Sequence, residues 1–168
     1  GGYTDWRLPT IKELYSLILF SGEDVDPQSM VVANLRPFID TEFFDFRYGD
    51  PTVGERIIDA QAVSSTRYVS TTMGGNSTVF GVNFADGRIK CYPTQSGPNA
   101  KLYFLRLVRG GEAYGENQFV EIGDGTISDL ATGLTWMEQD SGRAMNWGEA
   151  LVYCESLDYV GESDWRLP

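Results

Sequence analysis

One pentapeptide occurs at both ends of the chain and constrains the fold more than any other feature. Asp5-Trp6-Arg7-Leu8-Pro9 near the start is repeated as Asp164 to Pro168, 159 positions later. A five-residue identity that includes tryptophan is rare by chance, and so long a period indicates repeated whole domains rather than a solenoid. We therefore predict one period of a tandem repeat that starts within a unit. Residues 1–110 form the C-terminal part of one unit and residues 113–168 the N-terminal part of the next.

The chain has 168 residues, which fits a single domain with a substantial core over residues 1–168. A single domain is expected to have one structural position for the repeated motif. The chain is thus expected to fold as a circular permutant, or to exchange halves between molecules, giving a closed monomer or a swapped dimer. In either case, one of Trp6 and Trp165 is expected to be buried and the other exposed.

Two segments show the signals of short amphipathic helices. Thr10 and Glu13 form a T-x-x-E capping box before apolar residues at helical spacing, which predicts a helix over residues 10–20. Asn146 and Glu149 have the same spacing before a second helix over residues 146–158. Its apolar face is expected to point Cys154 into the core.

The middle of the chain changes to the period of two that is typical of strands. Residues 78–84 alternate, Asp86-Gly87 marks a hairpin turn into residues 89–92, and a further strand is expected over 102–108. Residues 119–122 and 126–128 flank a Gly-Asp-Gly turn, and residues 134–137 read as another strand. The prediction is an α+β fold, an antiparallel sheet flanked by two short helices. Residues 21–59 carry no assignable pattern.

The setting of the first motif copy before a capped helix favours a structural role. Trp6 is expected to anchor the core, Arg7 to pair with Asp5 or Glu13, and Pro9 to stiffen the backbone before the helix.

Charge and composition exclude several classes of function. With 13 basic and 24 acidic residues, the net charge is −11, which disfavours nucleic acid and anionic lipid as partners. Histidine is absent, which removes Ser/His/Asp and Cys/His relays. No apolar run approaches the length of a membrane-spanning helix, so membrane insertion is not expected. We predict a binding module rather than an enzyme.

Basic residues gather in one stretch that contains no acid, and this stretch is the candidate ligand site. The five cations are Arg88, Lys90, Lys101, Arg106 and Arg109. They form a local basic patch if residues 89–92 and 102–108 are neighbouring strands. The alternative is a solvated sheet edge, where basic side chains block strand pairing.

Acidic residues around the Gly-Asp-Gly turn form a candidate calcium-binding site. Asp124 and Asp129, with Glu121, offer oxygen ligands at short spacing, as calcium loops do. The alternative is a plain hairpin turn, which needs the same glycines. No other cofactor is expected. Cys91 and Cys154 fit either one disulfide or two small buried thiols.

Several motifs together resemble a known family. Asp124-Gly125-Thr126-Ile127-Ser128-Asp129, Thr132-Gly133-Leu134-Thr135-Trp136 and D-W-R-L-P are similar to the C-terminal domain family of the Legionella collagen-like adhesin. Ser64-Ser65-Thr66 and the strands ending at Gly87 and Gly110 resemble the central and closing strands of that family.

The resemblance implies a secreted or surface-exposed bacterial domain, adhesin-like and often repeated, whose architecture is similar to C-type lectin-like folds. It also implies a glycan or surface-protein partner, with sulfated glycans as the ligand class. Two departures stand out: Leu107 lies where the family often has cysteine in its closing strand, and the net charge of −11 is unfavourable for a polyanion. The alternatives are a structural spacer of a repetitive surface protein, or an enzyme on a C-type lectin-like fold.

Overall fold

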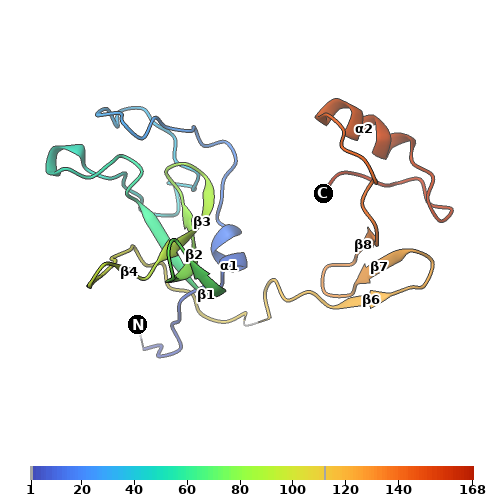
Figure 1. Ribbon diagram of the computed structural model, residues 1–168, viewed down its shortest axis with the longest axis horizontal. Helices are drawn as coiled ribbons and strands as arrows, with labels where there is room; N and C mark the ends of the chain where they lie inside the picture. The colour runs from blue at the N-terminus through green and yellow to red at the C-terminus, as the bar shows by residue number, and fades with distance from the viewer. Residues whose placement is uncertain (1, 112) are drawn as a thin grey trace. The chain divides into compact units, whose positions relative to one another are not determined.

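The chain contains two compact units in the computed structural model, which describes residues 2–111 and 113–168 (Figure 1). The units are Gly1–Gly115 and Glu116–Pro168.

The first unit is built on a three-stranded antiparallel sheet in the order β1-β2-β3. Its strands are β1 (Gln61–Thr72), β2 (Asn76–Asn83) and β3 (Arg88–Pro93). The expected Asp86-Gly87 hairpin is confirmed, since it joins β2 to β3 with Asn83 opposite Arg88. Gly87 has φ 67°, and a Cβ there would lie 2.5 Å from the Phe38 ring. Glycine is needed at this position both for the backbone conformation and for the close approach.

The prediction of a regular strand over residues 102–108 is wrong. This segment makes isolated bridges, Phe104 to Ala62 and Val108 to Arg7. The outer edge of β1 is shared: Val63 donates its backbone N–H to Phe104, but Ser65 donates to Pro9. Because the first motif copy takes the next position along this edge, residues 102–108 cannot continue a ladder with β1. After β3 the chain forms a small separate hairpin of β4 (Gln95–Ser96) and β5 (Asn99–Ala100).

The first predicted helix is confirmed but shorter than expected. Helix α1 covers Ile11–Tyr15, and the Thr10–Glu13 capping box is formed in both directions. It packs Leu14 against a core that includes Val82 and Phe84. Residues 21–59, which have no periodic pattern, also contribute to the core: Val25, Ile39, Ile57 and Ile58 are all buried. Apart from a 3-10 turn at Pro51–Val53, this segment is irregular.

The first motif copy differs from expectation at its tryptophan. Arg7 Nη2 lies 2.6 Å from Glu13 Oε1, which confirms the expected ion pair with Glu13 as its partner. Trp6, however, is 51% exposed, so the expected core anchor is wrong. The reason is the extended backbone at Arg7, which pairs with Val108. Side chains alternate along extended chain, and with Arg7 directed at Glu13, Trp6 faces the other side.

The second unit contains a three-stranded antiparallel meander and one helix. Strands β6 (Phe119–Glu121), β7 (Thr126–Asp129) and β8 (Leu134–Met137) pair in sequence order. The predicted hairpin and the predicted strand over residues 134–137 are both present. Helix α2 covers Trp147–Ser156 and begins with the predicted Asn146–Glu149 capping box. No residue of α2 is fully buried, and Cys154 is only half-buried, so the expected inward position of Cys154 is not reached.

In the second motif copy, Trp165 contacts residues that lie a few positions before it in the chain. Trp165 Nε1 donates to the carbonyl oxygens of Glu162, at 3.1 Å, and Tyr159, at 3.3 Å. Its ring contacts Tyr159 edge-on at 5.8 Å. Neither Trp6 nor Trp165 is fully buried, so the expectation of one buried and one exposed copy is wrong. Across the described residues, no helix is long and apolar enough to span a membrane.

Candidate functional site

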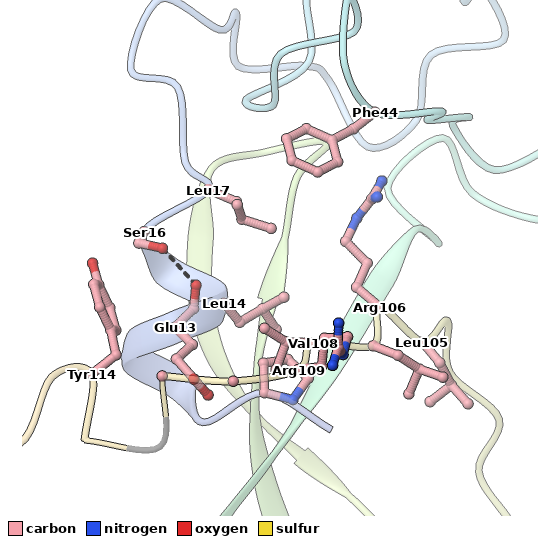
Figure 2. A pocket seen from close by; sticks show the side chains of 14 residues that line it. Glu13, Leu14, Ser16, Leu17, Phe44, Leu105, Arg106, Val108, Arg109 and Tyr114 are labelled. Carbon is pink, nitrogen blue, oxygen red and sulfur yellow. Dashed lines mark hydrogen bonds between the residues drawn. The ribbon is translucent and has the colours of Figure 1, made fainter. Parts of the chain in front are cut away.

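Two neighbouring grooves lie on the first unit, and they share Leu105 and Arg106. The larger, here called the α1 groove, has a volume of about 670 Å³ and lies between α1 and the segment around residues 105–111 (Figure 2). Leu14 and Leu17 on one side and Leu105 and Leu107 on the other make its walls largely apolar. The smaller groove, here called the aromatic groove, has a volume of about 320 Å³. It is lined by Asp45, Phe46, Arg47, Ala60, Ala62, Phe84, Phe104, Leu105 and Arg106.

Arg106 is fixed in place by aromatic rings rather than by a carboxylate. Its guanidinium carbon lies 5.3 Å from the Phe44 ring centroid and 5.8 Å from that of Phe84. Nη2 donates to the Asp45 carbonyl oxygen at 2.7 Å. Burial lowers the pKa of Arg106, which nevertheless stays charged at neutral pH. Among the described residues it has no ion-pair partner, so this half-buried cation keeps donors for an anion.

Arg47 is the second cation of the aromatic groove. Its guanidinium carbon lies 5.6 Å from the ring centroid of Phe104, whose side chain is 45% exposed. Within the part of the chain that the structure describes, Arg47 forms no ion pair. The aromatic groove thus combines an accessible aromatic ring with two guanidinium groups that form no ion pair among the described residues, and with Asp45, whose negative charge acts on Arg106. Small-molecule sites combine apolar and aromatic walls with a few oriented polar groups in this way.

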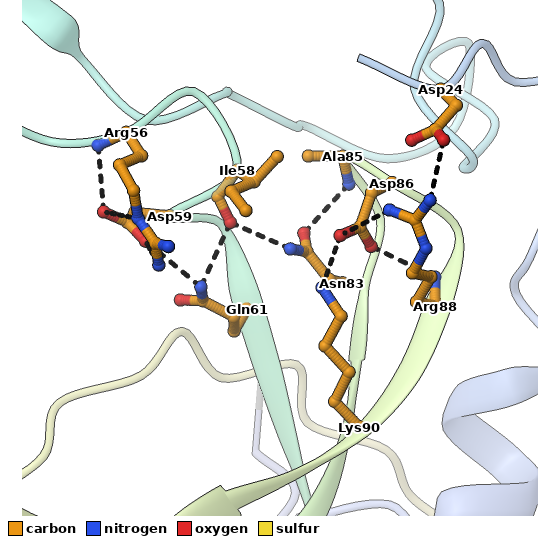
Figure 3. A network of polar contacts seen from close by, with 10 residues as sticks. All are labelled: Asp24, Arg56, Ile58, Asp59, Gln61, Asn83, Ala85, Asp86, Arg88 and Lys90. Carbon is orange, nitrogen blue, oxygen red and sulfur yellow. Dashed lines mark hydrogen bonds and ion pairs between the residues drawn. The ribbon is translucent and has the colours of Figure 1, made fainter. Parts of the chain in front are cut away.

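Arg88 and Lys90, two of the predicted site residues, are engaged within the protein (Figure 3). Arg88 pairs with Asp24 at 2.7 Å and with Asp86 at 3.2 Å. Lys90 pairs with the same Asp86 carboxylate, which is buried. Because two cations compensate one buried acid, most of their charge stabilises the β2–β3 hairpin instead of facing a ligand.

The structure does not bring the five predicted cations into one patch. Arg106 and Arg109 both line the α1 groove, on the β1 side of the sheet, whereas Arg88 and Lys90 are on β3. The condition for that patch, neighbouring strands over residues 89–92 and 102–108, is not met, because β2 lies between β3 and β1 and residues 102–108 bridge to β1 only at Phe104. Lys101 lies near the C-terminal end of β3, where its backbone N–H donates to the carbonyl oxygen of Thr94.

Arg109 is held at the rim of the α1 groove by two neighbours. Its Nε donates to Asp5 Oδ1 at 3.0 Å, and its guanidinium carbon lies 3.6 Å from the Tyr3 ring centroid. Glu13, the carboxylate of this groove, accepts hydrogen bonds from Arg7, and this contact lowers its pKa to about 2. It is therefore ionised at neutral pH and acts as a structural ion-pair partner.

Asp124 and Asp129 both organise turns of the second unit. Asp124 accepts from the backbone N–H and the hydroxyl of Thr126, the latter at 2.6 Å. Asp129 is fully buried and accepts four hydrogen bonds, from Asn117, Gln118, Ala131 and Thr132. The bond from the Gln118 backbone contributes most to a lowered pKa of about 2. In residues 2–111 and 113–168, no group of three acidic or cysteine side chains is placed to hold a metal ion.

The two cysteines are free thiols, Cys91 on β3 and Cys154 on α2, and both are half-buried. The structure therefore has no disulfide between them.

The sequence prediction missed Arg47 and its aromatic neighbours because they fall in the unassigned segment 21–59. A signal was present in the run Phe43-Phe44-Asp45-Phe46-Arg47-Tyr48, where aromatic residues alternate with charged ones. In a segment without strand or helix periodicity, such a run is more typical of a binding loop than of a core element.

The fold and grooves define an α+β module built from antiparallel sheets and two short helices, with concave surfaces formed by irregular segments. The chain matches the family described as Lcl C-terminal domain over residues 1–109 and 125–168. It therefore belongs to the Lcl C-terminal domain family, an adhesin-associated family of bacterial domains. No curated protein matches the chain. No solved structure matches it either, so the C-type lectin-like architecture stays a prediction.

Proposed function

We propose that this protein is a secreted or cell-surface binding module that recognises sulfated glycans through the aromatic groove. The observation that carries this proposal is the pair Arg47 and Arg106, which line one groove without carboxylate partners among the described residues. A sulfate group accepts hydrogen bonds from guanidinium donors as a carboxylate or phosphate does. Phe104, which lines the same groove and is 45% exposed, offers apolar surface for a sugar ring.

Local charge also supports this choice of ligand despite the net charge of the whole chain. The segment Gly1–Gly115 has 13 acidic and 11 basic residues, a net charge of −2, whereas Glu116–Pro168 has 11 acidic and two basic residues, a net charge of −9. The unit that contains the aromatic groove is therefore close to neutral. The two guanidinium groups contribute positive potential to the aromatic groove, which Asp45 in its lining partly offsets and which screening weakens beyond about 10 Å.

The test is binding of heparin oligosaccharides by the full chain and by single-residue variants. We expect Arg47→Gln and Arg106→Gln each to weaken binding about 10- to 150-fold, as loss of a charge-assisted hydrogen bond of about 1.5–3 kcal/mol predicts. Arg67→Gln is the matched control, because Arg67 is exposed on β1 and does not line either groove. It makes the same change of charge and is expected to bind like the parent.

A second variant set distinguishes the aromatic groove from the basic stretch predicted from sequence. Replacing Arg88, Lys90 and Lys101 with alanine should leave most of the affinity, since Arg88 and Lys90 are paired with acids. The proposal is contradicted by a parent that binds no sulfated oligosaccharide, or by Arg47 and Arg106 variants that bind as tightly as Arg67→Gln.

A further inference from the structure

We propose that Asp45 makes the aromatic groove selective for saccharides that keep free hydroxyl groups beside a sulfate, and disfavours saccharides that are sulfated at neighbouring positions. The inference rests on the proposed function and deepens it, because it concerns the ligand class of the same groove. Asp45 lines this groove together with Arg47 and Arg106. The groove therefore contains one negative and two positive side chains.

The carboxylate of Asp45 is free to accept hydrogen bonds from a ligand. Asp45 is the only acid among the described residues that line the aromatic groove, and it is exposed. Within residues 2–111 and 113–168 its side chain makes no hydrogen bond or ion pair. An exposed carboxylate is charged at neutral pH, and its two oxygens accept hydrogen bonds without donating any.

Glu13, the acid that lines the α1 groove, shows the opposite case. Both of its carboxylate oxygens accept hydrogen bonds from Arg7, and Oε2 also accepts from the backbone N–H of Thr10. These contacts commit Glu13 to the ion pair of the first motif copy and to the helix cap. The carboxylate of Asp45 has no comparable structural contact in the described part of the chain, which favours a role toward a ligand.

The backbone holds Asp45 close to one of the two cations. Its carbonyl oxygen accepts the 2.7 Å hydrogen bond from Arg106 Nη2, and the next residue, Phe46, contacts the Tyr48 ring edge-on at 5.1 Å. Burial lowers the pKa of Arg106, and the negative charge of Asp45 partly opposes this effect. The acid therefore acts on the place where a sulfate would bind, although it forms no ion pair with Arg106.

This arrangement of charges decides which saccharide substituents fit together. A sulfate beside a guanidinium group accepts its hydrogen bonds. A hydroxyl beside Asp45 donates to the carboxylate, whereas a second sulfate there brings two negative charges together. The groove volume of about 320 Å³ is at the lower end of the range of about 300–1,000 Å³ for small-molecule sites. Both substituents therefore belong to one short stretch of saccharide.

The experiment compares two heparin tetrasaccharides by isothermal titration calorimetry with the full chain. One is fully sulfated, and the other has lost its O-sulfates, so that it carries hydroxyl groups there and keeps its N-sulfates. We expect Asp45→Asn to bind the fully sulfated tetrasaccharide about two- to fivefold more tightly than the parent, as loss of an exposed like-charge contact predicts. It should bind the O-desulfated one about fivefold more weakly, because a neutral amide oxygen is a weaker acceptor than a carboxylate.

Glu42→Gln is the matched control, since it removes the same charge from the same irregular segment. Glu42 is exposed and lines neither groove, so this variant should keep the parent's ratio of affinities for the two tetrasaccharides. Asp45→Asn is expected to fold, because its side chain is exposed, and thermal unfolding by circular dichroism checks it. Its tighter binding of the fully sulfated tetrasaccharide should shrink as salt rises from about 10 to 150 mM, since salt screens the repulsion that the variant removes.

The outcomes separate this inference from the proposed function. A parent that binds neither tetrasaccharide overturns both. If binding depends on Arg47 and Arg106 but Asp45→Asn keeps the parent's ratio of affinities, only the selectivity is overturned. Equal strengthening of both ligands by Asp45→Asn also overturns the selectivity, because it would show a general effect of charge.

Discussion

At the scale of single residues, Arg7 and Trp6 show how the same motif contains one correct and one incorrect prediction. The Arg7–Glu13 pair is a contact between residues six positions apart, and the helix cap at Thr10 already fixes where Glu13 lies. The exposure of Trp6 depends on Val108, which is about one hundred positions away and sets the direction of the extended backbone. Local spacing therefore predicts the ion pair but not the tryptophan.

Glu13 gives a prediction for the dependence of stability on pH. Its pKa is lowered to about 2 in the folded protein, below the value of about 4.3 in an unfolded chain. A depressed pKa contributes stability that is present above the unfolded value and is lost as the pH falls from about 5 toward 2. Glu13→Gln should lower the free energy of unfolding at pH 7 by about 1–3 kcal/mol, and by less near pH 3.

Urea unfolding of the parent and of Glu13→Gln at pH 7 and pH 3 checks this. Glu42→Gln is the control, since Glu42 is exposed and has no ion pair among the described residues. An equal difference between parent and Glu13→Gln at both pH values would show that the Arg7 contact does not depend on the ionised carboxylate.

At the scale of elements, both capping boxes form, and both helices begin at the residue that the sequence indicates. The hairpins at Asp86-Gly87 and Gly123-Asp124-Gly125 form as well, because a turn and its two strands lie within a few residues of one another. The strand over residues 102–108 fails for a different reason. Its partner β1 has its outer edge shared with Pro9, and no pattern within 102–108 contains that information.

Helix α2 gives a prediction at this scale because its stability depends strongly on its cap. Asn146 Oδ1 accepts from the Glu149 backbone N–H at 2.9 Å, and Glu149 accepts from the Asn146 backbone N–H in return. Asn146→Ala should destabilise α2 by about 0.5–2 kcal/mol. The measurement is amide hydrogen exchange, in which the amides of α2 should exchange about two- to thirtyfold faster than in the parent. Unchanged exchange in β1 and β2 is the internal control, and uniform acceleration across the chain would contradict a local effect.

At the scale of the whole molecule, the uneven charge is the dominant feature. Glu116–Pro168 carries a net charge of −9 on 53 residues, and only Thr126 and Asp129 of its described residues are buried. Repulsion among these exposed acids opposes compactness, and dissolved salt screens it.

The chain is therefore expected to become more stable as salt is added at neutral pH. Raising sodium chloride from about 10 to 150 mM shortens the Debye length from about 30 to 8 Å, which should raise the Tm. Differential scanning calorimetry at pH 7 measures this, and the same series at pH 4.3, the isoelectric point, is the control because the net charge there is near zero. A Tm that falls with salt at pH 7 would show that the ion pairs outweigh the repulsion.

The sequence by itself determined the family, the α+β class, the two helix starts and the two hairpins. All of these depend on residues that are close together in the chain, and their signals are local spacing, caps and turns. Only the tertiary structure decided how the cations are used. Asp86 and Asp24 compensate Arg88 and Lys90, while a segment without periodicity brings Arg47 beside Arg106. Contacts between residues distant in the sequence depend on how the elements pack, and a single sequence carries no local pattern for that packing.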